Sequence, residues 1–491
     1  MYCMILSIVF PVLSGLYLLI RKEMKSRGGL LAGAGVCLAV TAVLTLLGSA
    51  TSHGGLFILF QLTEKLPILF KVDGMSVIFS LLSVISFTGA GIFSFVYMGH
   101  EEKEKRYYGF YLIVFGVLNG VWFAGNLITF YLFFELLTLC SFPLVLHNGS
   151  REAVMAGLKY LFYSLFGAYM ALFGVYFINQ YGNTLTFSQG GVISDQMWTG
   201  NSSLLLLAAA AMLIGFGVKA GMFPMHAWLP SAHPVAPAPA SAVLSAVIVK
   251  AGVLGALRTV YYIFGASRLA GTWVQTLWLV FILITILMGS LLAYREPVLK
   301  KRMAYSTVSQ VSYILFGLAM MDPESMTGAL FHVLCHGFLK TALFLCAGAI
   351  IYQTGRTRVE ELRGIGKEMP VLMWCYTIAS LGLIGIPPAG GFLSKWYLAQ
   401  GALSSLWVNS FGWIGTVVLL ISALLTAGYL LPVSIKGFLP GADFDYERLQ
   451  KKEPSWVMLM PICVLTALSV LIGLFPNGLI SRIGQIIEKL V

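Results

Sequence analysis

Long apolar runs recur along almost the whole chain, and short polar segments rich in lysine and arginine separate them. A helix needs about 20 apolar residues to cross a hydrocarbon core of about 30 Å. Runs of this length predict about fourteen transmembrane helices and an all-α polytopic membrane protein. The predicted spans are about 2–20, 30–50, 75–98, 108–124, 126–146, 155–179, 203–222, 240–262, 272–293, 304–320, 326–352, 371–398, 410–432 and 456–476.

The basic residues of the loops test this count. Most of them follow odd-numbered spans: Arg21, Lys22, Lys25, Arg27, Lys103, Lys105, Arg106, Arg151, Arg295, Lys300, Lys301, Arg302, Arg356, Arg358, Arg363, Lys367, Lys436, Arg448, Lys451 and Lys452. Loops after even-numbered spans hold only Lys65, Lys71 and Arg268, with Arg258 near the end of span eight. Because cytoplasmic loops are enriched in Lys and Arg, this alternation predicts that both termini lie outside the cytoplasm.

Composition supports a membrane protein and narrows its function. The chain of 491 residues is 58% hydrophobic and 10% charged, with a mean hydropathy of +0.86, which leaves no room for a soluble domain of ordinary size. The net charge of +11 lies mostly in short loops and is no sign of nucleic-acid binding. The seven cysteines form no C-x-x-C pair, so we expect no metal cluster and no cofactor in this chain. Segment 1–20 lacks a basic leader and is expected to be a retained helix.

Two segments five spans apart resemble each other and both contain helix-breaking residues. Span seven ends in Lys219-Ala-Gly-Met-Phe-Pro-Met-His-Ala-Trp-Leu, and span twelve contains Pro388-Ala-Gly-Gly-Phe-Leu-Ser-Lys395. Segments an odd number of spans apart have opposite orientations, which suggests an inverted five-helix repeat with spans seven and twelve broken. The predicted divisions are 1–107 (spans one to three), 108–263 (first repeat), 264–433 (second repeat) and 434–491 (a cytoplasmic loop, span fourteen and the tail).

Ionisable residues inside apolar spans are the main functional signal. A charge at the bilayer centre costs roughly 3 kcal/mol on insertion scales, and such residues normally face a bundle interior or a wet cavity. The residues are Glu135, Lys159, Lys219, Lys250, Lys340 and Lys395, joined by His332 and His336. Together they indicate proton handling within the membrane.

Glu135 is the only carboxylate deep in a predicted span, and Lys219 is its natural partner. A buried lysine next to a carboxylate holds a proton while paired and tends to release it when unpaired. Two interpretations stay open for this pair, a proton switch and a structural ion pair that fixes two helices. Lys250, Lys340 and Lys395 have no deep carboxylate to neutralise them, which favours a hydrated relay.

His332, His336 and Lys340 follow one another at one-turn intervals along one helix face. An i, i+4 histidine pair can bind zinc, but no third ligand has a suitable spacing and Lys340 would repel a cation, so we favour a proton relay. His226 and Lys159 are accessory candidates. His226 is equally well explained as a loop residue, and Lys159 as a residue that extends its amine to the membrane surface.

Several of these runs together resemble the antiporter-like subunits shared by Mrp-type sodium/proton antiporters, respiratory complex I and membrane-bound hydrogenases. The runs are Phe134-Glu-Leu-Leu, Lys219-Ala-Gly-Met-Phe-Pro-Met-His-Ala-Trp-Leu-Pro, 241–252, His332-Val-Leu-Cys-His-Gly-Phe-Leu-Lys340 and Gly390-Gly-Phe-Leu-Ser-Lys395. One branch of the complex I subunits has a glutamate at the position of Lys395. Another branch lacks the glutamate at the position of Glu135. The combination looks most like the D-type Mrp subunit, whereas the tail 480–491 matches no clear motif.

The resemblance implies a prokaryotic-type plasma membrane protein that works among other membrane subunits. It implies two half-channels, with Glu135 and Lys219 coupled, Lys250, His336 and Lys340 as the central connection, and Lys395 as the end of the second half-channel. The expected function is proton translocation within a cation (Na⁺)/proton antiporter. The alternative is the pump subunit of a redox-driven complex such as a hydrogenase or a complex I-like oxidoreductase, so membership of an enzyme complex stays open. A solute carrier or a scaffold fits the buried lysines less well.

Overall fold

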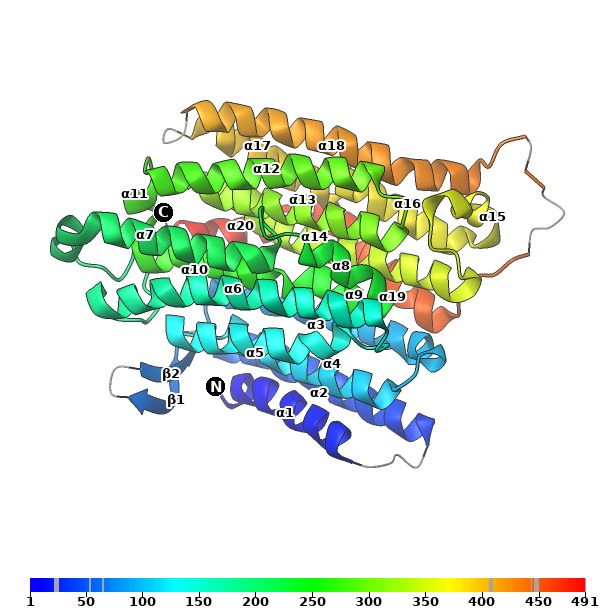
Figure 1. Ribbon diagram of the computed structural model, residues 1–491, viewed down its shortest axis with the longest axis horizontal. Helices are drawn as coiled ribbons and strands as arrows, with labels where there is room; N and C mark the ends of the chain where they lie inside the picture. The colour runs from blue at the N-terminus through cyan, green and yellow to red at the C-terminus, as the bar shows by residue number, and fades with distance from the viewer. Residues whose placement is uncertain are drawn as a thin grey trace.

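Apolar helices lie side by side along the long axis of the molecule (Figure 1). The computed structural model describes residues 1–21, 26–52, 54–63, 66–405, 409–442, 444–445 and 450–490. Lys22, Lys25, Lys65 and Arg448, used above to predict orientation, lie outside these residues. The long helices are α1 (Tyr2–Ile20), α2 (Arg27–Thr51), α3 (Gly74–Tyr97), α4 (Glu104–Trp122), α5 (Leu127–Val145), α6 (Arg151–Tyr181), α7 (Asp195–Ala220), α12 (Trp273–Arg295), α13 (Leu299–Ala319), α14 (Pro323–Thr354), α18 (Asn409–Phe438) and α19 (Trp456–Leu474).

Shorter elements complete the described chain. The short helices are α8 (Trp228–Val235), α9 (Ala238–Val243), α10 (Lys250–Arg258), α11 (Ala266–Leu269), α15 (Ile365–Glu368), α16 (Pro370–Ile384), α17 (Gly390–Ser404) and α20 (Asn477–Ile487). Two strands, β1 (Leu56–Thr63) and β2 (Leu66–Lys71), form an antiparallel hairpin. Single 3₁₀ turns lie at Met98–His100 and Val359–Leu362, and π-helical stretches lie at Leu244–Ile248 and Thr259–Phe264.

The helical membrane fold expected from the sequence is confirmed. In the described part of the chain, eleven helices are long and apolar enough to cross a membrane. The other predicted spans coincide with α4, α13 and the pair α16–α17. The first span was predicted at 2–20 and α1 is Tyr2–Ile20. The total of fourteen crossings and the inverted repeat stay predictions.

Both predicted helix breaks are present. α7 ends at Ala220, Gly221 adopts a φ of +81°, and the chain resumes as α8 at Trp228. α16 ends at Ile384, Gly385 adopts a φ of +95°, and α17 starts at Gly390. Glycine takes these left-handed conformations without the clash of a Cβ, so each break follows from the local sequence.

The hairpin and the π-helical stretches were not predicted. The segment 54–73 was treated as a connection between spans, but β2 pairs with β1 and also with the segment after α4, where Lys71 N donates to Phe123 O at 2.8 Å and Gly125 N donates to Leu69 O at 2.8 Å. Span eight, predicted as one helix at 240–262, consists of α9 and α10 with a π-helical stretch after each. Such stretches widen a helix locally and are frequent at functional sites.

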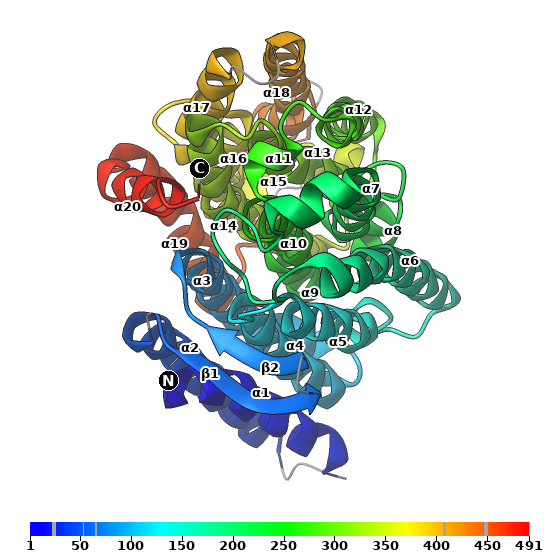
Figure 2. The same cartoon turned by 90° about the vertical axis from the view of Figure 1, so that its left-hand side faces the viewer.

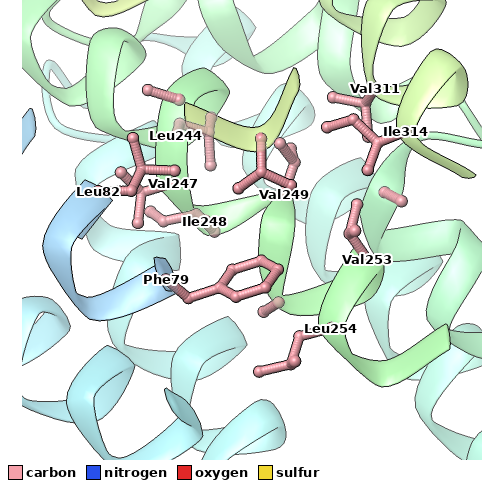
Figure 3. Close-up of a cluster of buried hydrophobic side chains, with 14 of the residues drawn as sticks. Phe79, Leu82, Leu244, Val247, Ile248, Val249, Val253, Leu254, Val311 and Ile314 are labelled. Carbon is pink, nitrogen blue, oxygen red and sulfur yellow. The ribbon is translucent and has the colours of Figure 1, made fainter. Parts of the chain in front are cut away.

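α14 forms the centre of the bundle. Every residue of α14 from Ser325 to Ile350 is buried, and α3, α13, α16, α17 and α19 pack around this helix. The close-up in Figure 3 shows part of the surrounding core, where Leu82 of α3 lies near Val247 and Phe79 of α3 lies near Leu254. Because lipid is as apolar as such a core, close packing rather than water exclusion holds these helices together.

The two termini lie at the end of the bundle that carries the hairpin (Figures 1 and 2). This agrees with an even number of crossings. The side of the membrane on which that end lies stays a prediction based on the basic loops.

A buried ion pair ties α3 to the end of α10. Arg258 is 2% exposed, and its guanidinium donates to Asp73 Oδ2 at 2.5 Å and to Asp73 Oδ1 at 3.0 Å. Asp73 also caps α3 by accepting from Ser76 N. Burial disfavours the Asp73 carboxylate, but the charge of Arg258 and these hydrogen bonds outweigh burial and hold the pKa of Asp73 below its usual value.

Removing one partner of this pair leaves the other charge buried without compensation. We therefore expect Asp73→Asn to lower the free energy of unfolding by about 3 kcal/mol. The matched control is Asp195→Asn, which removes the pair of Arg268 with the 94% exposed Asp195 and should cost less than about 1 kcal/mol. Reversible unfolding in mixed micelles measures both. Equal effects of the two substitutions would contradict the prediction.

Candidate functional site

Lys219 lies in the last turn of α7, directly before the first helix break, and is 1% exposed. Its Nζ donates to Thr138 Oγ1 on α5 at 2.8 Å and to the Tyr160 hydroxyl on α6 at 2.6 Å. The Tyr160 hydroxyl is also 2.7 Å from Ser141 Oγ. The amine therefore sits in a cage of hydroxyl groups contributed by two neighbouring helices.

Glu135 lies near this cage without a direct ion pair to Lys219. Of the described residues, none holds the half-buried Glu135 carboxylate in a salt bridge within 4.0 Å, and its buried Oε1 has no hydrogen-bond partner among them. Thr138, which accepts from Lys219, follows Glu135 by one helical turn on α5. The predicted partners are thus neighbours, and the structural ion pair considered above is not formed in this structure.

Lys250 and His336 meet at the centre of the bundle. Lys250 Nζ is 2.6 Å from His336 Nδ1 and also donates to Ser245 O at 3.1 Å. Both side chains are fully buried. Lys250 lies two residues after the first π-helical stretch, and its bond to the carbonyl of Ser245 within that stretch uses the widened turn.

The close approach of α10 to α7 brings this centre near Lys219. A Cβ on Gly252 would come within 2.4 Å of Phe216 O and 3.1 Å of Lys219 Cβ, so only glycine permits this packing. Within the described chain, no hydrogen bond joins the amines of Lys219 and Lys250 directly. A proton passing between them requires bridging water.

The helix face predicted to carry His332, His336 and Lys340 is fully buried in α14. The two imidazole rings lie 5.8 Å apart between centroids. His332 Nδ1 is 2.8 Å from Ser394 Oγ of α17, and Lys340 Nζ donates to Met303 O of α13 at 3.0 Å. Ser394 precedes Lys395, so His332 connects the central residues to the second break.

Lys395 donates to the last carbonyl groups of α16, Leu383 O and Ile384 O, at 2.8 Å each. Its amine also lies 5.0 Å from the centre of the Tyr313 ring. The free carbonyls at a helix C-terminus carry partial negative charge, which stabilises a cation. The second break therefore supplies the acceptors for its own lysine.

These contacts refine the expectation that the central lysines lack compensation. No carboxylate of the described chain forms a salt bridge with them, yet Lys250, Lys340 and Lys395 each donate to a backbone carbonyl. Helix breaks and π-helical turns free such carbonyls from their usual partners. The irregular backbone thus accommodates Lys250 and Lys395. Lys340 instead shares the carbonyl of Met303, inside α13, with the Thr307 hydroxyl.

The two accessory candidates lie away from the buried row. Lys159 is half-buried on α6, where it donates to Ser231 Oγ of α8 at 3.1 Å and lies 5.9 Å from the centre of the Tyr163 ring. His226 is half-buried in the first break, stacked on Phe223 at 6.3 Å between ring centroids. No direct hydrogen bond joins either side chain to Lys219 in the described chain.

Four further polar residues belong near the row and were not identified from the sequence. Thr138 and Tyr160 bind Lys219. His233 is fully buried, and neither of its ring nitrogens has a partner in the described structure. Lys300, counted among the loop cations, is buried and donates to Pro234 O at 3.2 Å. For Thr138 the sequence did offer a signal, because its hydroxyl group lies one helical turn from the charged Glu135 in an otherwise apolar helix.

Lysine and histidine side chains thus form a row, buried except at the half-buried Lys395, through a helical membrane bundle with two broken helices. The family described as NADH:quinone oxidoreductase/Mrp antiporter, TM, matches residues 124–426, and this chain belongs to it. The chain is 33% identical over 420 residues to the N subunit of NADH-quinone oxidoreductase from Desulforudis audaxviator, covering 82% of each chain. It is 27% identical to the D subunit of the Na(+)/H(+) antiporter from Alkalihalophilus pseudofirmus, covering 99% of this chain and 97% of the other.

The fold is also that of a solved membrane complex. A chain in the structure of the Mrp complex from Dietzia sp. matches with a TM-score of 0.84 at 21% identity, covering 100% of this chain and 98% of that chain. The helical arrangement is therefore shared throughout the length of the chain.

The hydrogen bond from Lys219 to Thr138 can be tested by substitution. A hydrogen bond to a charged group contributes roughly 1.5–3 kcal/mol, so Thr138→Val should lower the free energy of unfolding by about 2 kcal/mol. In a Lys219→Met background the same substitution should cost well under 1 kcal/mol, because its charged partner is gone. Unfolding titrations of the four variants in mixed micelles measure this coupling. A Thr138→Val effect of the same size in both backgrounds would show that the bond does not exist.

Proposed function

We propose that this chain is a proton-translocating subunit of a multisubunit membrane complex of the Mrp-type cation/proton antiporter class. The contact of 2.6 Å between Lys250 and His336 carries the proposal, because it joins two proton-exchanging groups from different helices at the bundle centre. The family membership and the shared fold support it. The D-type antiporter relative, which aligns over nearly the whole chain, favours the antiporter class.

The proposed path runs from Lys219 to Lys395. A proton reaches Lys219 from one aqueous face while Glu135 supplies a negative charge nearby. A shift of the Glu135 side chain relative to Lys219 weakens the hold on the proton, which passes through water to Lys250 and His336. His332 and Lys340 continue the path, and Ser394 connects His332 to the segment of Lys395. Release then follows at the opposite face.

The inverted repeat and the division at 108–263 and 264–433 belong to the same proposal. Lys219 contacts α5 and α6, while Lys395 lies over Tyr313 of α13 and beside Ser394, which contacts α14. In the predicted repeat α13 corresponds to α5 and α14 to α6. The segments that carry the two break lysines therefore contact equivalent pairs of helices, and two half-channels of opposite orientation would follow.

Neutralising Lys219 should abolish proton transport and leave assembly intact. We expect Lys219→Ala to reduce transport to background in inverted membrane vesicles, measured with a pH-sensitive dye. The control is Lys436→Ala, an exposed lysine at the end of α18, which should transport normally. Persistent transport in Lys219→Ala vesicles that contain a complex of normal size would refute this path.

A second candidate function is the pump subunit of a redox-driven complex, and the 33% identity to an NADH-quinone oxidoreductase subunit favours it. The proton path would be the same, with the driving energy supplied by partner subunits. Sodium prefers several oxygen ligands including carboxylates, and Glu135 is the only carboxylate in the proposed path, so we assign any sodium path mainly to a partner.

Iron and acid-labile sulfide in the complex, purified gently through this chain, distinguish the two classes. The antiporter class predicts no iron and a set of small membrane subunits. Stoichiometric iron and sulfide would overturn that class in favour of the redox-driven one, because electron transfer between partner subunits requires such centres. An inventory of the subunits in the same sample provides the control, because it shows whether a peripheral module was lost during purification.

A further inference from the structure

An open groove of about 700 Å³ lies on the outer surface between α6, α8 and the start of α13. Its walls are mainly apolar, with Met155, Leu158 and Phe162 on one side and Pro230 and Val235 on the other. It exists because the first break leaves only the short helix α8 beside the 31-residue helix α6. The proton path uses none of these residues except the accessory candidate Lys159.

Charged groups of both signs line the groove. Lys159 has one hydrogen-bond acceptor in the described structure, Ser231 Oγ, although an ammonium group has three donors. Lys301 is 39% exposed and pairs with Glu296 at 2.9 Å. Glu152 lies exposed in the first turn of α6. The groove therefore presents free donor capacity from a cation deep inside and a carboxylate near its outer end.

The depth of these charges matches the membrane interface. α6 is about 46 Å long and exceeds a hydrocarbon core of about 30 Å by about 8 Å at each end if it is centred. Lys159 follows the first residue of α6 by eight positions, or about 12 Å, which places it about 4 Å inside the hydrocarbon boundary. Its long side chain can reach the phosphate level, whereas Glu152 lies further out in the headgroup region.

We propose that this groove binds a phospholipid whose headgroup carries a phosphate and a primary ammonium, as in phosphatidylethanolamine. The phosphate lies against Lys159 with Lys301 beside it, the ammonium faces Glu152, and an acyl chain covers Leu158 and Phe162. The order of charges along the groove, cation deep and carboxylate shallow, is complementary to the order of phosphate and ammonium in this headgroup. The assignment is independent of the energy source of the complex.

The test uses the intact complex in native membranes supplied with phosphatidylethanolamine that carries a photoreactive group on its acyl chain. We expect cross-links to peptides containing 155–163 and 230–235. In Lys159→Ala/Lys301→Ala the labelling should fall by about 30-fold, since each of the two lysines near a lipid surface contributes about 1 kcal/mol. The matched control, Lys367→Ala/Lys436→Ala, replaces two exposed lysines outside the groove and should label normally.

A second variant separates loss of binding from loss of folding. Leu158→Trp fills the groove from a 48% exposed position and leaves both lysines in place, so labelling should fall while the complex keeps its size in gel filtration. A phosphatidylglycerol probe should label the wild-type groove several-fold less. Three outcomes would overturn the proposal. They are equal labelling by both headgroups, labelling that the variants do not change, and cross-links of the lipid probe to a partner subunit with none to the peptides of the groove.

Discussion

Each amine inside this bundle needs hydrogen-bond acceptors, and the structure is organised around that requirement. An unpaired buried charge costs several kcal/mol, which a protein of marginal stability cannot carry repeatedly. A regular helix offers no free carbonyl in its interior, because every carbonyl already accepts from the next turn. Lys250 and Lys395 therefore lie where the backbone is irregular, and Lys219 lies against hydroxyl groups of neighbouring helices. Lys340 instead shares the Met303 carbonyl of α13 with Thr307.

The irregular segments follow from that requirement. Lys395 takes its acceptors from the C-terminus of α16, which exists only because the helix stops at Gly385. Lys250 takes its acceptor from a π-helical turn. Irregular backbone at membrane depth is tolerated where protein surrounds it, and α14 with its neighbours supplies that enclosure. The same features that stabilise the amines also place a row of lysine and histidine side chains in an apolar bundle.

The sequence predicted the helices well because hydrophobic length alone determines them. It also predicted both breaks, since glycine and proline at 221–224 and 385–391 leave few alternatives. It could not show that Thr138 rather than Glu135 contacts Lys219, because that depends on how α5 rotates against α7. Lys300 was counted as a loop cation for a similar reason: its position near a helix start says nothing about the carbonyls of α8 that lie above it. The hairpin of β1 and β2 was not predicted, because it depends on pairing with the distant segment after α4.

The two ends of the row of lysine and histidine side chains differ in the groups that hold the amine. Lys219 is held by hydroxyl groups, which donate as well as accept and can therefore serve either an ammonium or a neutral amine. Lys395 is held by two carbonyl oxygens, which only accept, and by an aromatic ring that attracts cations. A neutral Lys395 would keep two donors bonded but turn its lone pair toward the negative face of Tyr313. The hydrogen-bond partners of Lys219 thus suit both forms of the amine, whereas those of Lys395 are acceptors only. In the proposed path, proton release from Lys395 would therefore involve the second break, and proton exchange at Lys219 would involve the hydroxyl groups of its cage.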